Sequence, residues 1–245
     1  MTPATKLALA AGCSAILAAT AVAVVIAVPA AAAPARSFDL PSFTEAEIST
    51  ELTVKFAVGS AQSIAVDAAN QADLDDLRLE VRGDRLYAWM QRDFWDFVSF
   101  RDHTVVVTAT VPALHKITAG SASAVQVQGM TGNLVEIEAA SAASVDIVGI
   151  DATSALIKAS SSAAVRLSGT CVNATYQLSS SASVGARGFE CTDLDIEATS
   201  SASALLFASG DVNAIAFSGA DVVLAGHPVH VDDDEDSGGD ITVLN

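Results

Sequence analysis

Hydrophobic residues alternate with small or polar residues through most of the chain after residue 113. The clearest runs are Ile117–Val127, Ile137–Ile147 and Ile157–Leu167. Alternation with a period of two places successive side chains on opposite faces of a strand. Each run therefore predicts a β-strand with one buried face. In the first run, the residues predicted to face inward are Ile117, Ala119, Ser121, Ser123 and Val125.

This alternating pattern recurs about every twenty residues. Its copies begin at Ile117, Ile137, Ile157, Leu178, Ile196 and Ile215. Such a period predicts a solenoid, in which each coil buries its apolar residues only against neighbouring coils. Inward residues of successive coils should then stack in columns. Gly129, Gly149 and Gly169 recur at one phase, which indicates a corner where the backbone turns.

We therefore expect an all-β protein, a single-stranded parallel β-helix with three short strands in each coil. A coil of about twenty residues has a perimeter near 66 Å, and coils stack about 4.8 Å apart. A leucine-rich horseshoe has a similar period, but its Leu-x-x-Leu-x-Leu signature is absent from the sequence. Disorder of an Ala/Ser-rich chain is the other interpretation, and apolar residues at a fixed phase argue against it.

Charge narrows the range of partners. The net charge is −17, and the segment after Gly120 contains 16 acidic and three basic residues. Such a surface repels nucleic acid and anionic lipid headgroups, so we exclude both as ligands. Two pairs of opposite charge are each twenty residues apart and should meet across adjacent coils. They are Glu138 with Lys158 and Asp146 with Arg166.

Two of the three cysteines have the separation of one coil. Cys171 and Cys191 are twenty residues apart, so stacking brings them close to the roughly 5.5 Å Cα separation of a disulfide. An oxidising, exported setting favours this bond. Two buried free thiols are the alternative, because the irregular spacing near Leu178 could shift the register.

The first 35 residues predict an export signal. Lys6 precedes an almost wholly apolar run, Leu7–Val28, and small residues at 30–35 suit cleavage. The run is long enough for an uncleaved membrane anchor instead, and Cys13 offers a weaker lipoprotein alternative. Residues 36–245 then form one domain, with a less regular β part and cap at 36–112 and regular coils at 113–245.

The first part of this domain carries a family resemblance. Segments Leu52–Val66, Leu74–Leu86 and Val105–Leu114, the Ala-Gly-Ser-Ala repeat and the closing Gly226-His-Pro motif resemble the exported bacterial head GIN domain family. Its members carry the label of auto-transporter adhesins. The resemblance implies a right-handed parallel β-helix and a cell-envelope location, and it supplies no catalytic residues. A segment at 91–103 looks like an insertion relative to the family.

Aromatic residues gather at and before this insertion, and they are the candidate binding residues. They are Trp89, Phe94, Trp95, Phe97 and Phe100. An exposed aromatic patch suits contact with a sugar or a protein. The alternative is a cap, because an open end of a β-helix exposes core and unpaired backbone groups. Nearby, Arg82-Gly83-Asp84-Arg85 predicts a hairpin turn, which also accounts for an Arg-Gly-Asp tripeptide of the kind that integrins bind.

An acidic stretch near the C-terminus is the candidate metal site. Asp232, Asp234 and Asp236 alternate as in the beginning of a calcium loop, but Ser237 and Val243 stand where an EF-hand needs Gly and Glu. A solvated acidic turn is the alternative. His227 and His230 could add transition-metal ligands, although Pro228 favours a turn.

The sequence therefore favours a non-enzymatic exported module in the periplasm or at the cell surface. Its expected partner is an envelope protein or a glycan, and no cofactor is expected. The alternatives are a polysaccharide lyase or hydrolase, since β-helices often host such enzymes, and a calcium-binding surface protein. Paired acids are needed for glycoside hydrolysis, and Asp193 and Asp195 do share one side of a strand.

Overall fold

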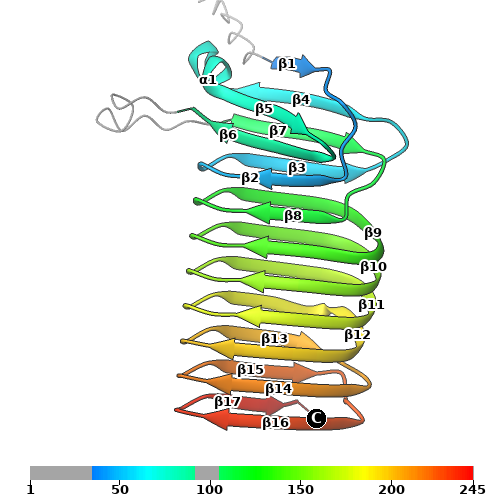
Figure 1. Ribbon diagram of the computed structural model, residues 1–245, viewed down its shortest axis with the longest axis vertical. Coiled ribbons are helices and arrows are strands. Elements are labelled where there is room, and N and C mark those ends of the chain that lie inside the picture. The colour runs from blue at the N-terminus through cyan, green and yellow to red at the C-terminus, as the bar shows by residue number, and fades with distance from the viewer. Residues whose placement is uncertain (1–34, 92–104, 245) are drawn as a thin grey trace, which may run out of the picture. The chain divides into compact units, whose positions relative to one another are not determined.

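Long bent strands form the regular coils. In the computed structural model, which describes residues 35–91 and 105–244, these strands are β9 (Ala124–Ala139), β10 (Ser144–Ala159), β11 (Ala164–Leu178) and β12 (Ser183–Thr199). Each follows one coil and pairs in parallel with the next (Figure 1). The β9–β10 ladder has three segments, with Ser144–Val148, Ile150–Ala152 and Ser154–Ala159 on the β10 side. The expected parallel β-solenoid is confirmed, with three strand segments merged into one bent strand per coil.

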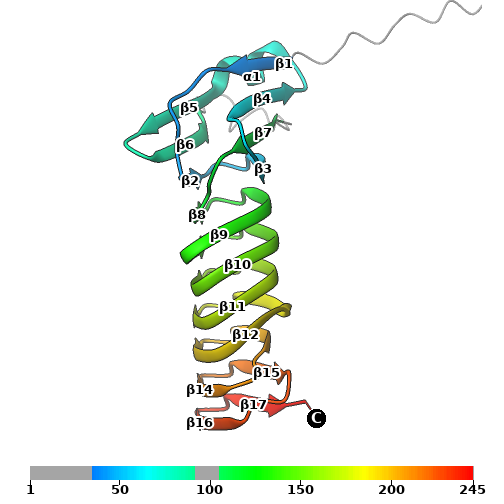
Figure 2. The same cartoon turned by 90° about the vertical axis from the view of Figure 1, so that its right-hand side faces the viewer.

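Shorter strands continue the stack toward the C-terminus. They are β13 (Ser203–Phe207), β14 (Asp211–Phe217), β15 (Asp221–Ala225), β16 (His230–Asp236) and β17 (Asp240–Val243). One side of the solenoid continues through β13, β15 and β17, and another through β14 and β16. Figure 2 shows the bends of β9 to β12 lying one above another, with the shorter strands below them.

A tight turn interrupts the alternation in every regular coil. Ser121 and Ala122 have φ of 52° and 58°, and the equivalent pairs in the following coils are also left-handed. Both residues of the turn are exposed. The prediction that Ser121 faces inward is therefore wrong, because the turn lifts it out of the strand. Ser123 is buried, its hydroxyl lies 3.4 Å from the carbonyl oxygen of Ile48, and its neighbour in the next coil is Ala143.

The inward isoleucine column passes through a tyrosine. Ile157 pairs with Tyr176, and Tyr176 pairs with Ile196. The predicted repeat start at Leu178 is therefore wrong by two residues, because an aromatic ring occupies the isoleucine position. The start at Ile215 is wrong by one residue, since Ala214 is the partner of Ile196.

The corner glycines adopt the backbone conformation that their recurrence predicts. Gly129 and Gly149 have φ of 80° and 78°, a left-handed region that glycine enters without a Cβ penalty. Gly169 has φ of 135°, and a Cβ there would collide with the backbone of Ile150. At Gly169 the corner therefore requires glycine, because the backbones of the two adjacent coils approach too closely there for a Cβ.

The strands of the N-terminal part do not stack in the order in which they follow one another along the chain. Its elements are β1 (Ala35–Phe38), β2 (Glu45–Ile48), β3 (Thr53–Val58), β4 (Ser63–Ala68), α1 (Gln71–Asp76), β5 (Leu77–Arg82), β6 (Arg85–Met90), β7 (Val105–Val111) and β8 (Lys116–Ala119). Strand β2 lies between β6 and β8, and β3 lies between β7 and β9. Thr50 and Glu51, between β2 and β3, repeat the left-handed turn of the regular coils. Residues 45–58 are therefore a coil that the sequence pattern did not reveal.

Antiparallel strands end the stack on this side. Strand β4 pairs antiparallel with β1 and β7, and β5 pairs antiparallel with β6. The β5–β6 hairpin turns at Gly83, which has φ of 66° and lies between the paired residues Arg82 and Arg85. The predicted hairpin is confirmed. Helix α1 is capped by the preceding residue Asn70, whose side chain accepts a hydrogen bond from the backbone N–H of Asp73, and the helix buries Leu74.

Several predictions concern residues outside the described ranges. Phe94, Trp95, Phe97 and Phe100 lie there, as does the export signal or anchor predicted for residues 1–35, apart from Ala35. Among the helices that the structure does describe, none is long and apolar enough to cross a bilayer.

Candidate functional site

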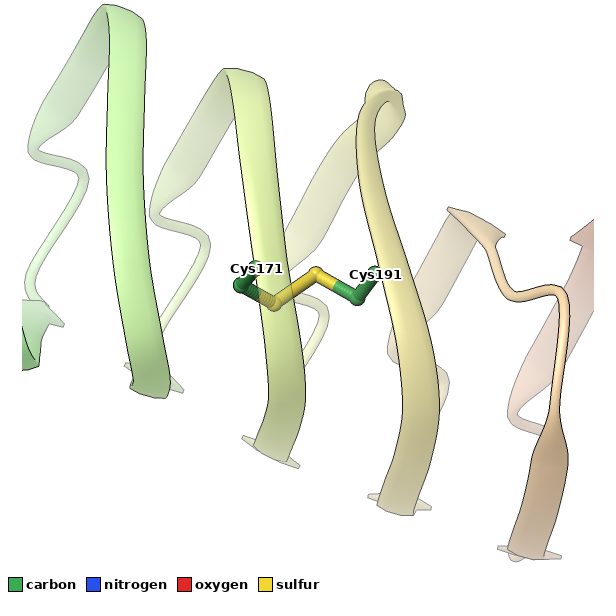
Figure 3. Close-up of a disulfide and its surroundings, with 2 residues drawn as sticks. All are labelled: Cys171 and Cys191. Atoms are coloured by element: carbon green, nitrogen blue, oxygen red, sulfur yellow. A yellow bond between two sulfur atoms is a disulfide. The ribbon is translucent and has the colours of Figure 1, made fainter.

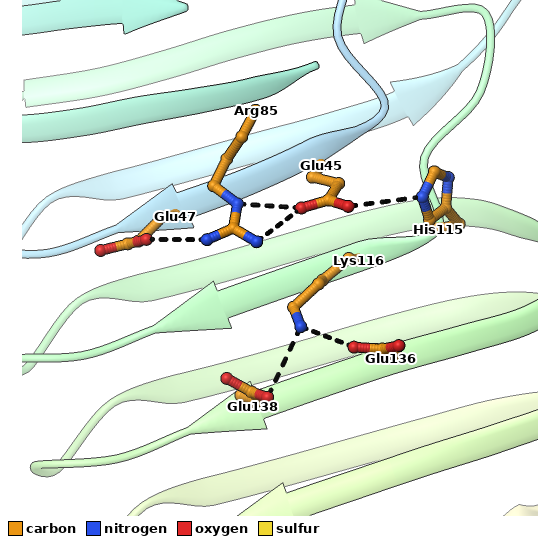
Figure 4. Close-up of polar contacts among 7 residues, drawn as sticks. All are labelled: Glu45, Glu47, Arg85, His115, Lys116, Glu136 and Glu138. Carbon is orange, nitrogen blue, oxygen red and sulfur yellow. Dashed lines mark hydrogen bonds and ion pairs between the residues drawn. The ribbon is translucent and has the colours of Figure 1, made fainter. Parts of the chain in front are cut away.

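One outward face of the solenoid carries a ladder of alternating charge. Four side chains from four neighbouring strands form it: Arg85 of β6, Glu45 of β2, Lys116 of β8 and Glu136 of β9 (Figure 4). Their backbones are direct ladder partners, so the signs alternate along the solenoid axis. We call these four residues the charge ladder.

The contacts within the charge ladder are short. The Arg85 guanidinium donates from Nε and Nη2 to one oxygen of Glu45, at 2.9 and 2.7 Å. Nζ of Lys116 lies 2.6 Å from Glu136 and 3.6 Å from Glu138. His115 and Glu47 extend the cluster, at 3.7 Å from Glu45 and 3.4 Å from Arg85 respectively (Figure 4).

These contacts shift the pKa values of the paired groups. The hydrogen bond from Lys116 lowers the pKa of Glu136, and the hydrogen bond to Glu136 raises the pKa of Lys116. The pKa of Arg85 is raised, chiefly by its hydrogen bond to Glu45. Each group is thereby held in its charged form. The charge ladder is suited to fixing the register between the N-terminal strands and the first regular coils, rather than to proton transfer.

Removing the Lys116 charge should make stability less sensitive to acid. The pKa of Glu136 is lowered in the folded chain, so its stabilising contribution is present above its unfolded pKa of about 4.3 and is lost as the pH falls below that value. For a partly exposed pair we expect a contribution of about 1 kcal/mol at neutral pH. Urea unfolding of the wild type, Lys116→Met, Glu136→Gln and the double variant, at neutral and acidic pH, measures this coupling. A coupling that does not shrink in acid would contradict the assignment.

The two charge pairs predicted from the repeat lie one coil apart, as expected. Glu138 is the ladder partner of Lys158, and Asp146 is the partner of Arg166. Among the ion pairs of the described residues, however, Glu138 contacts Lys116. The register is therefore as predicted, but neither pair is among the ion pairs in the part of the chain that the structure describes, so the expected contacts between the side chains of adjacent coils are not formed.

The same face becomes acidic toward the C-terminus. Asp193 accepts a hydrogen bond from the backbone N–H of Asp211 at 2.9 Å, and Asp195 accepts one from Asn213 at 3.3 Å. Both carboxylates considered for catalysis thus hold neighbouring strands together. Asp232, Asp234 and Asp236 are exposed on β16. Within the described residues, no group of three or more potential ligands is arranged to hold a metal ion, and the structure lends no support to the calcium hypothesis.

The last coil places charge where earlier coils place apolar residues. Asp233 pairs with Ala214, and Glu235 pairs with Ala216; both alanines are buried. A further coil stacking here would have to bury these carboxylates. Charges on the inward side are a known means by which an edge strand avoids pairing with another chain.

Trp89 is the one predicted aromatic binding residue that the structure describes. It lies half-buried on β6, on the outward side of the strand, and its ladder partner in β5 is Arg78. The neighbouring outward residue Tyr87 lies under the Arg82 guanidinium, whose central carbon is 5.3 Å from the ring centroid. Trp89 thus belongs to the same outward face as the charge ladder.

The predicted disulfide is present. Cys171 of β11 and Cys191 of β12 are direct ladder partners, with a Cα separation of 4.5 Å (Figure 3). Their relative exposures are only 8% and 2%. The register shift that left two free thiols as an alternative falls earlier in these strands, between Arg166 and Ser168, so it does not separate the cysteines.

The described geometry fits one known family. Residues 42–228 match the family model described as "Putative auto-transporter adhesin, head GIN domain". The chain belongs to the head GIN domain family. This match spans the interwoven N-terminal strands, the regular coils and most of the C-terminal coils. The family resemblance noted from the sequence is therefore confirmed. No curated protein matches the chain.

Solved structures share the fold of this head GIN domain. A protein of Bacteroides fragilis, described as a putative adhesin, has a TM-score of 0.78 at 15% identity, and the match covers 88% of this chain and 99% of the other. A Parabacteroides distasonis protein described as a putative lipid binding protein has a TM-score of 0.68 at 14% identity, covering 87% and 97%. A Parabacteroides merdae protein described as a putative adhesin has a TM-score of 0.65 at 11% identity, covering 87% and 97%. Identities this low show the fold alone.

Proposed function

We propose that this head GIN domain is a non-enzymatic, adhesin-like module that is exported and acts at the cell envelope. The match to a family whose description names an auto-transporter adhesin carries the proposal. An apolar N-terminal run and a disulfide between adjacent coils support export, because disulfides persist in oxidising compartments. The partner is an envelope protein or a glycan.

The electrostatics of the described residues suit a binding module. Asp193 and Asp195, the two carboxylates considered for catalysis, accept hydrogen bonds from the next strand. The basic residues Arg85 and Lys116 are engaged by glutamates. These groups stabilise the stack, and the remaining outward positions offer a broad surface of small and polar side chains for contact.

Adhesion of beads tests this function. Beads coated with the purified full chain should adhere to surfaces that carry envelope polysaccharide or envelope protein, and beads coated with heat-unfolded chain should not. The same preparation, incubated with a panel of soluble polysaccharides, should release no new reducing ends and form no unsaturated products. Turnover of a polysaccharide would favour the lyase or hydrolase alternative, and equal adhesion by folded and unfolded chain would contradict specific binding.

A further inference from the structure

A column of small residues runs along the face that carries the charge ladder. Its members are Ser49, Gly120, Ala140, Ser160 and Ser179. Backbone hydrogen bonds place each of them one strand from the next: for example, the N–H of Gly120 donates to Ile48, that of Ala140 to Ala119 and that of Ser160 to Ala139. Because these side chains are short, the surface above them is hollowed.

The hollow is large enough for an extended ligand. An open depression of about 470 Å³ lies over Ala140, Ser160 and Ser179, comparable in volume to small-molecule sites but shallower. A second depression, of about 300 Å³, shares Gln177 and Ser179 with the first and extends it to Thr199. Together they form a groove along the solenoid axis, which we call the axial groove.

Hydrogen-bonding side chains stand along one side of the axial groove. They occupy the outward position two residues before each member of the small column and before Thr199, and they are Glu47, Thr118, Glu138, Lys158, Gln177 and Glu197. Since neighbouring strands are about 4.8 Å apart, the groove offers one polar side chain on every rung. This spacing is comparable to the length of one sugar residue in an extended chain.

Aromatic rings stand at both ends of the small column. Trp89 flanks Ser49, because the N–H of Ser49 donates to the carbonyl oxygen of Ala88. At the other end Phe217 is the ladder partner of Thr199, which borders the groove. Both rings are half-buried and on outward positions. Trp89 and Phe217 therefore offer apolar ring surface at either end of the small column, Phe217 beside the groove and Trp89 two strands beyond the lining residue Thr118.

We propose that the axial groove binds an extended, uncharged carbohydrate chain. Sugars present hydroxyl groups on their edges and C–H groups on their faces, which match the polar side chains and the aromatic rings. An extended peptide fits less well, because the floor is the face of a sheet whose backbone groups already pair within the ladder, leaving none for strand addition.

Charge selects among carbohydrates. Lys158 and Glu138 are adjacent in the wall of the groove and offset each other, while the chain as a whole carries −17. That net charge disfavours acidic glycans. The inference rests on the proposed adhesin-like function, and it names the ligand class and the surface that this function uses.

Calorimetric titration of the full chain with four hexasaccharides tests the inference. Three are neutral (cellohexaose, maltohexaose and chitohexaose), and the fourth is acidic (hexagalacturonate). At least one neutral probe should bind, and in a Trp95→Phe background it should also change the fluorescence of Trp89, the other tryptophan of the chain. The variant Ala140→Leu with Ser160→Leu fills the groove and should weaken binding by at least about tenfold. The control, Ser144→Leu with Ala164→Leu, places the same side chains across the same two turns on the opposite side of the coil, and should bind like the wild type.

The possible results distinguish a failure of the groove assignment from a failure of the proposed adhesin-like function. Lack of binding by all neutral probes, preference for hexagalacturonate, or equal weakening by the control pair would overturn the groove assignment. Urea unfolding of both double variants checks that they fold. If beads coated with the groove-filled variant adhere as well as the wild type, the groove is wrong and the adhesin-like function stands; if wild-type beads fail to adhere, the function itself fails.

Discussion

Replacing Tyr176 with alanine is expected to lower the free energy of unfolding by about 3–5 kcal/mol, the range for deleting a large buried aromatic side chain. The exposed fraction of Tyr176 is 1%, and its ring occupies the column otherwise filled by Ile157 and Ile196. Removing the ring leaves a cavity between two coils. Because a coil contacts mainly its neighbours, the loss should also divide the solenoid into two less cooperative parts.

Urea unfolding followed by circular dichroism measures this effect. Tyr176→Ile restores an apolar side chain of the column and should recover much of the loss, while Gln177→Ala changes only the adjacent exposed residue and should cost less than about 0.5 kcal/mol. Burial also raises the pKa of the Tyr176 hydroxyl, so this tyrosine should ionise in alkali only as the chain unfolds. An alanine variant as stable as the wild type would show that the coils close over the cavity.

Removing the disulfide is expected to cost about 3 kcal/mol, the chain-entropy value for a closed loop of this length. Cys171 and Cys191 are separated by 20 residues, so the bond closes one whole coil. The double variant Cys171→Ala with Cys191→Ala avoids leaving a buried free thiol. Its urea midpoint should match that of the wild type unfolded in the presence of a reductant.

Mass spectrometry after alkylation provides the control for this prediction. Both sulfurs are buried and bonded, so alkylation should leave them unmodified in the oxidised, folded chain and should label both of them after reduction and unfolding, in addition to Cys13 where the chain retains it. Adding reductant to the double variant should change nothing. If reductant shifts the urea midpoint of the double variant as much as that of the wild type, the loss would have a cause other than the Cys171–Cys191 bond.

The regular half of the fold was readable because its signals are local. Ile117, Ile137 and Ile157 recur at a constant interval, and an even interval keeps the inward side chains in one column. The disulfide and the ladder positions of the two charge pairs followed from the same register. The pattern erred at Ser121, because two left-handed residues form a turn in the middle of the alternation. It erred at Leu178 because Tyr176 replaces an isoleucine.

The N-terminal part could not be ordered from its sequence. Strand β2 pairs with β6 and β8, although 40 residues separate Glu45 from its partner Arg85. Strand β3 pairs likewise with β7 and β9. The sequence of this part shows strands and a hairpin, but no period reveals which strands become neighbours. The left-handed pair Thr50 and Glu51, which repeats the turn of the regular coils before Leu52, became visible only in the structure.

The candidate binding surface depended on this missing topology. The aromatic cluster pointed to Trp89, but the partners of that residue along the face come from β2 and from the coils. Nothing in the sequence singled out the small residues Ala140, Ser160 and Ser179. They form a groove only when stacked strands place them in a column beside Glu138, Lys158 and Gln177.

The sequence by itself determined the period, the inward face of each regular strand, the corner glycines and the pairing of the two cysteines, since each of these depends on residues one coil apart. Only the tertiary structure decided how β2 and β3 insert between later strands, and with them the charge ladder and the axial groove. Such contacts join segments that no repeat relates, so their register is set by packing over the whole stack rather than by any local pattern.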